Sequence, residues 1–540
     1  MVNNINKGHI SKDRLEMTDK TADNESEKKF FSKVSLNMVT NITRVVVMAL
    51  VGLLMVPYYI DQFGLATYAI LPLATSITTY VLVASESLAE SFTRFMILAI
   101  HKGDREGIDE TYSSSVIGMI RIILILMPVV ILLSILSPYI FNVNGNGYAD
   151  VQIMFLLVLV ASLMVSFTTC LDSVFMAYNY LYVLYSIRIV HCIIQVVFVV
   201  IFFMIEGPSL ILLGVSYLLA AILLIVGLLY GVRKIDPELR VRRSKYNKEL
   251  LKEMSTLGMW SIVARLGSIM FVQTSQIVVN VCLGSEIQGE FSIIANVVSM
   301  IATCSTAFIT VGVPLLYKHY NDGNREMLIY TLDLFTRFVG LVLAFPIAYL
   351  FIFAPQVLTA WLGTTYDNTV TMMMIMIPIC VARCCIDILG AVALLYKDAR
   401  TMGLGTIFFG IMNVILAVIL IEFTDLGVYG ACIAWVISIG LMNVVFYPVF
   451  ISRLMDVSIM LFMKSLAVDY LAFGILIGLG LLFNHFFELP YGLLWIMVSF
   501  TICFVVYFIT IMRLGVRGEE RGIVLSYFPQ FMQKYLRKLA

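Results

Sequence analysis

Long apolar segments follow one another along almost the whole chain and are separated by short polar connections. Each is about 20 residues or longer, the length that an α-helix needs to cross the hydrocarbon core of a bilayer. The pattern predicts an all-α integral membrane protein with fourteen transmembrane helices. The predicted spans are 37–60, 66–92, 113–136, 151–176, 180–204, 209–232, 256–282, 289–317, 328–354, 369–395, 402–421, 427–450, 463–486 and 490–512.

Basic residues alternate between the connections. None of the seven odd-numbered connections contains lysine or arginine, whereas the even-numbered ones include HKGDREG at 101 and KDAR at 397. The connection at 233–252 alone holds eight basic residues. Because lysine and arginine concentrate in cytoplasmic loops, the even-numbered connections are predicted to be cytoplasmic. The sequence therefore predicts a multi-pass protein of the cell membrane with both termini in the cytoplasm.

The two sides of the basic connection resemble each other. FGLATY at 63 matches LGSEIQ at 283, and KGDRE at 102 matches DGNRE at 322, both at an offset of 220 residues. The offset predicts two six-helix repeats that enter the membrane in the same sense, as parallel repeats. The predicted organisation is a polar cytoplasmic tail (1–35), an N-terminal bundle (36–233), a basic linker (234–255), a C-terminal bundle (256–453), two additional helices (454–514) and an amphipathic cytoplasmic tail (515–540). The last segment is expected to lie on the inner membrane surface, or else to be a short frayed helix.

Composition supports a chain with little soluble mass, since 60% of its residues are hydrophobic and 13% are charged. The nine cysteines lie in or beside apolar runs and form no zinc-binding spacing with histidine, so we expect no metal site. The connections carry no constellation of catalytic residues, which argues against a multispan glycosyl- or acyltransferase and predicts that the protein is not an enzyme. No nucleic-acid partner and no cofactor are expected.

Arginines within the spans are the candidate binding residues. Arg44 in span 1 and Arg265 in span 7 are near-equivalent in the two repeats, eight or nine residues from the cytoplasmic end. An arginine at this depth can extend its guanidinium to the interface, as Arg121 and Arg337 could. Alternatively, arginines from both repeats line a hydrated cavity that takes an anionic guest, because the guanidinium binds phosphate bidentately. The candidates for this role are Arg44, Arg265, Arg188 and Arg383.

Acidic residues within the spans are fewer. Asp172 and Asp387 occupy matching places in spans 4 and 10, and Asp387 follows Arg383 by one helical turn, which a local ion pair would explain. Glu86 and Glu90 lie one turn apart near the inner end of span 2. The alternative is that these four carboxylates form protonation or cation sites that couple transport to a proton or sodium gradient.

Two stretches carry a family resemblance: VPYYIDQFGLATYAI at 56–70 and FTRFMILAIHKGDRE at 92–106. With the repeat and the fourteen spans, they resemble the multidrug/oligosaccharidyl-lipid/polysaccharide exporter superfamily, and within it the Wzx-type polysaccharide flippases. The resemblance covers about residues 36–515. It implies two six-helix bundles around a V-shaped central cavity, alternating access, and a polyprenyl-diphosphate-linked glycan as cargo. It also implies that cavity arginines lie on span 1 and near the start of the second bundle, which here are Arg44 and Arg265.

The alternative within the superfamily is a cation-coupled multidrug exporter of the MATE type. That branch resembles the chain less well, because it has twelve spans and acidic residues in spans 1 and 7, where this chain has arginine. The resemblance therefore implies an anionic cargo that is moved from the inner to the outer leaflet. We expect a monomer in contact with membrane lipid and with other polysaccharide-assembly proteins.

Overall fold

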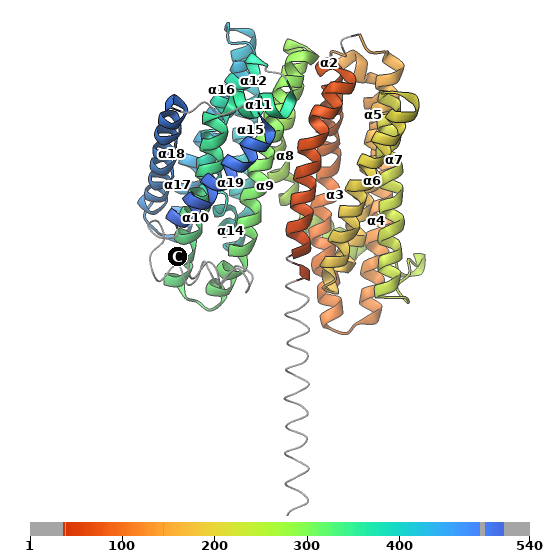
Figure 1. Cartoon of the computed structure of the whole chain (residues 1–540). Coiled ribbons are helices and arrows are strands. Elements are labelled where there is room, and N and C mark those ends of the chain that lie inside the picture. Colours follow the sequence, from red (N-terminus) through yellow and green to blue (C-terminus); the bar gives the residue numbers. More distant parts are fainter. Residues whose placement is uncertain (1–35, 38, 144, 364–365, 487–491, 512–540) are drawn as a thin grey trace, which may run out of the picture.

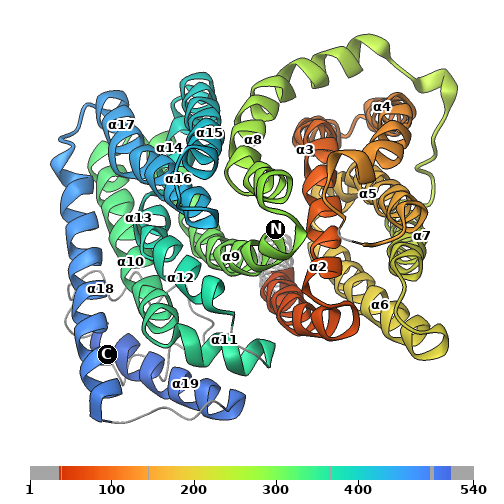
Figure 2. The ribbon, with the colours of Figure 1, turned by 90° about the horizontal axis from the view of Figure 1, so that it is seen from above.

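The computed structural model describes residues 36–37, 39–143, 145–363, 366–486 and 492–511. Within these ranges the chain is almost entirely helical and contains no β-strand. Two groups of helices stand side by side, as Figure 1 and the view from above in Figure 2 show. The predicted tails 1–35 and 515–540 lie outside the described residues.

The N-terminal bundle begins with the helix Val39–Phe63. Gly64 turns the chain into the short helix α2 and the long helix α3, and four further helices complete the bundle. Their bounds are α2 Leu65–Tyr68, α3 Ile70–His101, α4 Arg105–Ile140, α5 Tyr148–Ala177, α6 Leu181–Glu206 and α7 Leu210–Ile235. Helix α7 ends on the same side of the molecule as the linker 236–247 (Figure 1). We call this side the linker side, and the opposite side the far side.

The C-terminal bundle follows a 3₁₀ turn in the linker, η1 Arg243–Lys245. Its helices are α8 Lys248–Leu283, α9 Ser285–Asn321, α10 Arg325–Ile352, α11 Ala354–Leu362, α12 Asp367–Met376, α13 Ile379–Ile386, α14 Leu389–Leu395, α15 Ala399–Glu422 and α16 Val428–Gly440, continued by the π-helical η2 Leu441–Phe446 and by α17 Tyr447–Met455. The additional helices α18 Met460–Phe486 and α19 Leu493–Thr510 pack on the edge of this bundle away from the N-terminal one (Figure 2). As a result α10 lies at the bundle centre, and most of its side chains are buried.

The predicted spans are present, with two departures in form. Twelve helices of the described chain are long and apolar enough to cross a membrane. The predicted span 369–395 is broken by a bend of 40° between residues 368–376 and 379–395, because Pro378 lacks the amide hydrogen that would continue the helix. The fourteenth segment, α19, is apolar but shorter than the others. The fold is the predicted all-α membrane architecture.

The connection between the predicted spans 328–354 and 369–395 contains a short helix. Ala354–Leu362 form α11, with Pro355 in the first turn where its missing N–H costs nothing. Within α11, Trp361 donates its indole N–H to the carbonyl of Leu53 in the first helix. Pro57, four residues after Leu53, cannot donate to that carbonyl, so the indole replaces the missing helical hydrogen bond. This contact ties the two bundles together.

The duplication is visible in paired contacts at an offset of 220 residues. Arg105 at the start of α4 pairs with Asp236 at the end of α7 at 2.5 Å. Arg325 at the start of α10 likewise lies 3.9 Å from Asp456 at the end of α17 and donates to its carbonyl at 2.8 Å. The N-caps of α4 and α10, Asp104 and Asn324, also correspond, and each accepts a hydrogen bond from the backbone three residues on.

The linker is fastened to the N-terminal bundle. Asp236 accepts hydrogen bonds from Arg105 and from the Tyr178 hydroxyl, and the backbone of Arg242 donates to Ser113 at 3.1 Å. Burial alone raises the pKa of Asp236, but the bonds from Arg105 and Tyr178 outweigh it and leave that pKa below its ordinary value. Lys245 also pairs with Glu106. The linker is therefore a docked segment.

Beyond the linker and the first turns of α8, hydrogen bonds join the described parts of the two bundles on the far side and around mid-depth. Asn142, after α4, donates its backbone N–H to Asn280 of α8 at 2.9 Å and accepts from the Asn280 amide at 3.3 Å. Deeper in, Ser76 donates to Gln276 at 3.3 Å. Polar contacts on the far side and at mid-depth thus join the two bundles.

Candidate functional site

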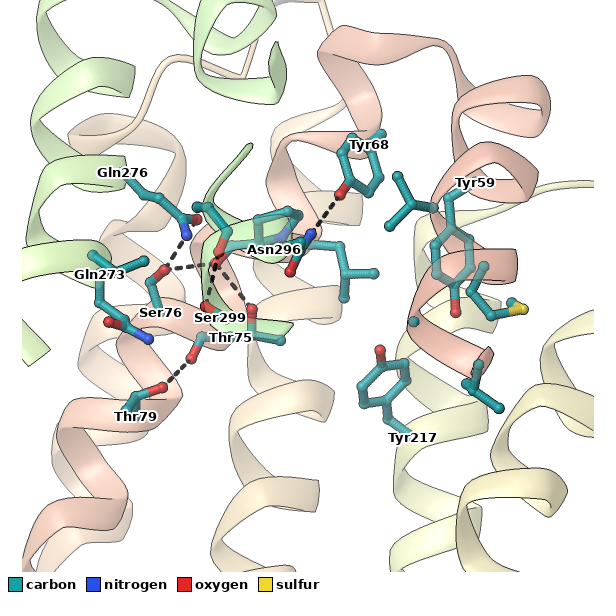
Figure 3. Close-up of a pocket in the computed structure, with 18 of the residues that line it drawn as sticks. Tyr59, Tyr68, Thr75, Ser76, Thr79, Tyr217, Gln273, Gln276, Asn296 and Ser299 are labelled. Atoms are coloured by element: carbon teal, nitrogen blue, oxygen red, sulfur yellow. Dashed lines mark hydrogen bonds between the residues drawn. The ribbon is translucent and has the colours of Figure 1, made fainter. Parts of the chain in front are cut away.

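A cavity of about 370 Å³ lies between the two bundles at mid-depth (Figure 3). Six spans contribute to its wall: the first helix, α3 with the preceding α2, α6, α7, α8 and α9. The residues that line it are Val51, Gly52, Met55, Val56, Tyr59, Tyr68, Leu71, Pro72, Thr75, Ser76, Thr79, Gln195, Val196, Tyr217, Val272, Gln273, Gln276, Ala295, Asn296 and Ser299. Both bundles therefore face one shared chamber.

The wall combines apolar and polar residues and carries no charged side chain. It carries four amide side chains, on Gln195, Gln273, Gln276 and Asn296, together with hydroxyls of serine, threonine and tyrosine. Figure 3 shows Asn296 donating to the Tyr68 hydroxyl at 3.3 Å, and Ser76 bonded to Gln276. Amides and hydroxyls both donate and accept hydrogen bonds, so this lining suits a neutral, hydroxyl-rich guest.

Three of the four candidate arginines precede the cavity residues by the same interval. Arg44 comes before Val51, Arg188 before Gln195 and Arg265 before Val272, each by seven residues. Seven residues are about two helical turns, or about 10 Å, which returns a side chain to nearly the same helix face. All three helices start on the linker side, so the arginines extend the cavity-facing stripes toward that side. None of the three lines the cavity itself.

Two of these arginines lie together in the N-terminal bundle. Arg188 of α6 forms an ion pair with Asp172 of α5 and donates to Thr168 at 3.0 Å. Arg44 lies over the ring of Tyr185, with 5.2 Å between its Cζ and the ring centroid, and interacts electrostatically with Arg188 and Asp172. The Asp172 carboxylate is thus paired with Arg188 and lies near the Arg44 guanidinium, so the cluster holds two positive side chains and one acid.

The Arg44 guanidinium is also held on its own helix. It donates to the side-chain oxygen of Asn41 at 3.0 Å from Nη2 and at 3.3 Å from Nε. Arg44 is half-buried, so its charge is neither fully in lipid nor enclosed. The stacking on Tyr185 and the amide contact fix the direction of the fork.

The remaining candidates lie in the C-terminal bundle and on α3. In the C-terminal bundle, Arg383 Nε lies 4.0 Å from Asp387, to which Ser305 of α9 also donates at 3.4 Å. The local pair expected from their spacing is therefore present. Arg265 is half-buried on α8. The side chains of Glu86 and Glu90 lie outside the described part of the chain.

Sequence reasoning missed the neutral lining of the cavity. Gln195, Gln273 and Gln276 stand inside apolar spans, where an unpaired amide costs free energy, and that cost is the signal that could have singled them out. Arg121 and Arg337 lie elsewhere: Arg121 stacks on Tyr246 of the linker at 4.4 Å, and Arg337 lies 4.0 Å from Asp333.

Comparison with known proteins identifies the family. The profile of the family described as "Polysaccharide biosynthesis protein" matches residues 34–319, which is 286 of 540 residues. The chain belongs to the polysaccharide biosynthesis protein family. As a member of this family, it is 25% identical over 434 residues to the uncharacterized membrane protein EpsK of Bacillus subtilis (strain 168), covering 80% of this chain and 86% of that protein.

Solved structures place this family member in the fold of the multidrug/oligosaccharidyl-lipid/polysaccharide exporter superfamily. An inward-facing multidrug resistance MATE family transporter superposes with a TM-score of 0.63 at 15% identity, covering 78% of this chain and 99% of that one. An outward-facing transporter of the same family gives 0.59 at 16% identity over 79% and 96%. A superfamily transporter from Pyrococcus furiosus gives 0.58 at 17% over 78% and 96%; it was described as having a binding pocket of reversed polarity. The expected superfamily resemblance is confirmed.

Proposed function

We propose that this protein is a flippase that moves a polyprenyl-diphosphate-linked oligosaccharide from the inner to the outer leaflet of the cell membrane by alternating access. The family profile supports a role in polysaccharide biosynthesis. The observation that carries the proposal is the division of the space between the bundles: an uncharged chamber of amides and hydroxyls, with arginines two turns nearer the linker side on three of its helices.

The two zones match the two polar parts of such a substrate. A diphosphate would bind the guanidiniums of Arg44, Arg188 and Arg265, whose planar forks suit phosphate oxygens. The sugars would occupy the chamber, where Gln273, Gln276 and Asn296 offer donors and acceptors to hydroxyl groups. The prenyl chain would remain in lipid. On the positive-inside assignment, the linker side is the cytoplasmic side, so the arginines would meet the substrate first.

The position of the contacts between the bundles supports alternating access. The far-side contacts of Asn142, Asn280 and Trp361 must open, and the linker side must close, for the chamber to face outward. Moving the diphosphate out of water is costly, and the arginine cluster would offset that cost by supplying fixed positive charge. Coupling to a proton or sodium gradient remains part of the proposal, with Asp172 and Asp387 as candidates.

The test is translocation of a fluorescent prenyl-diphosphate oligosaccharide in vesicles that contain the purified protein. Arg44→Ala and Arg265→Ala should each lower the rate at least tenfold, and the Arg→Lys variants should restore little because a lysine cannot bind bidentately. Arg121→Ala is the matched control, because Arg121 is an intramembrane arginine on a helix that does not line the cavity.

The same vesicles should be assayed for efflux of cationic dyes, since the solved MATE structures share this fold. The uncharged cavity offers no carboxylate to a cationic drug. Dye efflux without movement of the lipid would replace the proposal with multidrug export. Normal transport by both alanine variants would refute the role of the arginines.

A further inference from the structure

Asp469 is a buried acid outside the site described above. It lies on α18, the first of the two helices that follow the repeats, and its residue is 0% exposed. Neither of its carboxyl oxygens receives a hydrogen bond from a nitrogen or oxygen donor among the described residues. The polar group that approaches it is the thiol of Cys385 on α13. An ionised carboxylate with no stronger partner is very costly at this depth, so the neutral acid is the favoured form.

A glycine on the neighbouring helix α10 leaves room for this carboxyl group. A Cβ atom placed at Gly340 of α10 would come within 1.8 Å of Asp469 Oδ2, so the acid occupies the space left by a missing side chain. Leu466 and Phe473, one turn before and after it on α18, are both buried. Asp469 is thus enclosed between α10, α13 and α18.

The Arg337 guanidinium could pair with an ionised Asp469, but in this structure it lies beside Asp333. Arg337 of α10 interacts electrostatically with Asp469, but its Nη2 lies 4.0 Å from Asp333, one turn away on the same helix. Ser465 of α18 in turn donates to Asp333 at 3.1 Å. The other titratable groups that face the acid are Tyr470 of α18 and Tyr507 of α19.

The surroundings of Asp469 suit a proton better than a metal cation. Sodium and the divalent cations need several oxygen ligands, whereas Asp469 is a single carboxyl beside a thiol. Among the described residues, no group of three or more His, Cys, Asp or Glu side chains could hold a metal ion. The nearby guanidinium would also repel a cation.

We propose that Asp469 is a proton-binding site of the C-terminal bundle, loaded in the conformation described here and emptied when α18 shifts on α10. On release, the O–H bond of the acid breaks, the proton passes to water, and the carboxylate is paired by Arg337, which exchanges Asp333 for Asp469. Proton binding is thereby linked to the packing of α18 against the central helix of the bundle. The use of this step to drive export rests on the proposed function.

Infrared difference spectroscopy of the full chain in lipid nanodiscs tests the site without any transport substrate. At neutral pH the wild-type protein should show a protonated-carboxyl band that is lost in Asp469→Asn and kept in Asp333→Asn. An identical spectrum of wild type and Asp469→Asn in this region would show that Asp469 is ionised and would overturn the proposal.

Thermal stability provides a second measurement that separates the proton site from a simple ion pair. Asn mimics the neutral acid, so Asp469→Asn should melt at or above the wild-type temperature, with the advantage growing as the pH is raised. A variant that is less stable at every pH would instead indicate an ionised Asp469 held by Arg337.

The coupling is tested by imposing a pH gradient on the transport vesicles. Acceleration of lipid translocation by the gradient should be present in the wild type and lost in Asp469→Asn, and an unchanged acceleration in the variant would refute the coupling. If the wild-type protein moves no glycolipid at all, the proposed function fails, while spectroscopy and melting still decide the proton site.

Discussion

Single side chains in this protein are placed where their cost in the membrane is offset by a neighbour. Arg44 lies over Tyr185 and is held by Asn41, and Arg188 is paired with Asp172. A glycine can have a similar role, because its missing side chain leaves space for a neighbouring polar group. At Gly340 the absent side chain is what allows an acid to sit within the bundle.

The substitution Gly340→Ala tests that packing. The added methyl group would collide with the Asp469 carboxyl, which is fixed between three helices, so we expect a loss of about 1–3 kcal/mol in stability. The measurement is the melting temperature of the purified protein. Gly474→Ala, on α18 with open space around it, is the matched control and should leave the melting temperature unchanged. Equal behaviour of the two variants would contradict the tight contact.

At the scale of elements, equivalent helix ends in the two bundles are joined by equivalent ion pairs. The pair Arg105–Asp236 and its counterpart Arg325–Asp456 join the first residue of one helix to the residue after another, in both bundles. In the N-terminal bundle this pair also anchors the linker, because Tyr178 donates to the same carboxylate. A long basic connection is in this way converted into a defined structure.

Asp236→Asn should loosen the linker. We expect local opening to become about 1 kcal/mol easier, or about fivefold more frequent, because a charge-assisted hydrogen bond is lost. Limited trypsin cleavage at Arg240–Lys245 measures the opening. Since the pKa of Asp236 is lowered in the folded protein, its contribution is complete at neutral pH and is lost as the pH falls below the ordinary carboxyl value of about 3.9.

Wild type and variant should therefore differ at neutral pH and converge in strong acid, where linker opening can be followed by hydrogen exchange. Glu238→Gln, a neighbouring change that leaves the Arg105 pair intact, serves as the control. Equal cleavage of wild type and Asp236→Asn at neutral pH would show that the pair does not hold the linker.

Much of this element-level structure is readable from the sequence, for definite reasons. Span length and hydropathy reflect bilayer thickness, so the spans and both bundles were predictable. The residues around Gly64 and Gly284 repeat because both turn the chain between paired helices. By contrast, α11 was missed because its nine residues are too short to show a periodic pattern. Asp469 was missed because one carboxylate in an apolar run does not reveal whether it has a partner.

The same distinction applies to the candidate site. The sequence singled out the arginines because a charge in a span is conspicuous, and it gave the local pair of Arg383 and Asp387 through their spacing. It did not give the cavity, since Gln195, Gln276 and Asn296 come from three helices whose mutual rotation only tertiary packing decides. The roles of all these residues in binding remain predictions.

For the whole molecule, the decisive feature is the uneven distribution of contacts between the bundles. Asn142 and Asn280 bind each other through two hydrogen bonds on the far side, and the cavity lies deeper. An alternating-access carrier must break such contacts in every cycle, so they have to be weak enough to open and specific enough to re-form.

A crosslink at this point should stop transport. In a background in which the exposed Cys304 and Cys503 are replaced by serine, Asn142→Cys with Asn280→Cys should react with a short bismaleimide. We expect the crosslinked protein to lose glycolipid translocation by at least tenfold. The monofunctional maleimide is the control and should reduce transport far less. Full activity of the crosslinked protein would show that the far side does not open.

The proline in the first helix has a consequence for the energetics of this cycle. While the bundles meet on the far side, the Leu53 carbonyl that Pro57 leaves open is satisfied by Trp361. Once they part, that oxygen must find water or remain bare at a depth where water is scarce. Pro57 thereby favours the conformation in which the bundles meet on the far side. Without substrate, the cavity should therefore open toward the linker side.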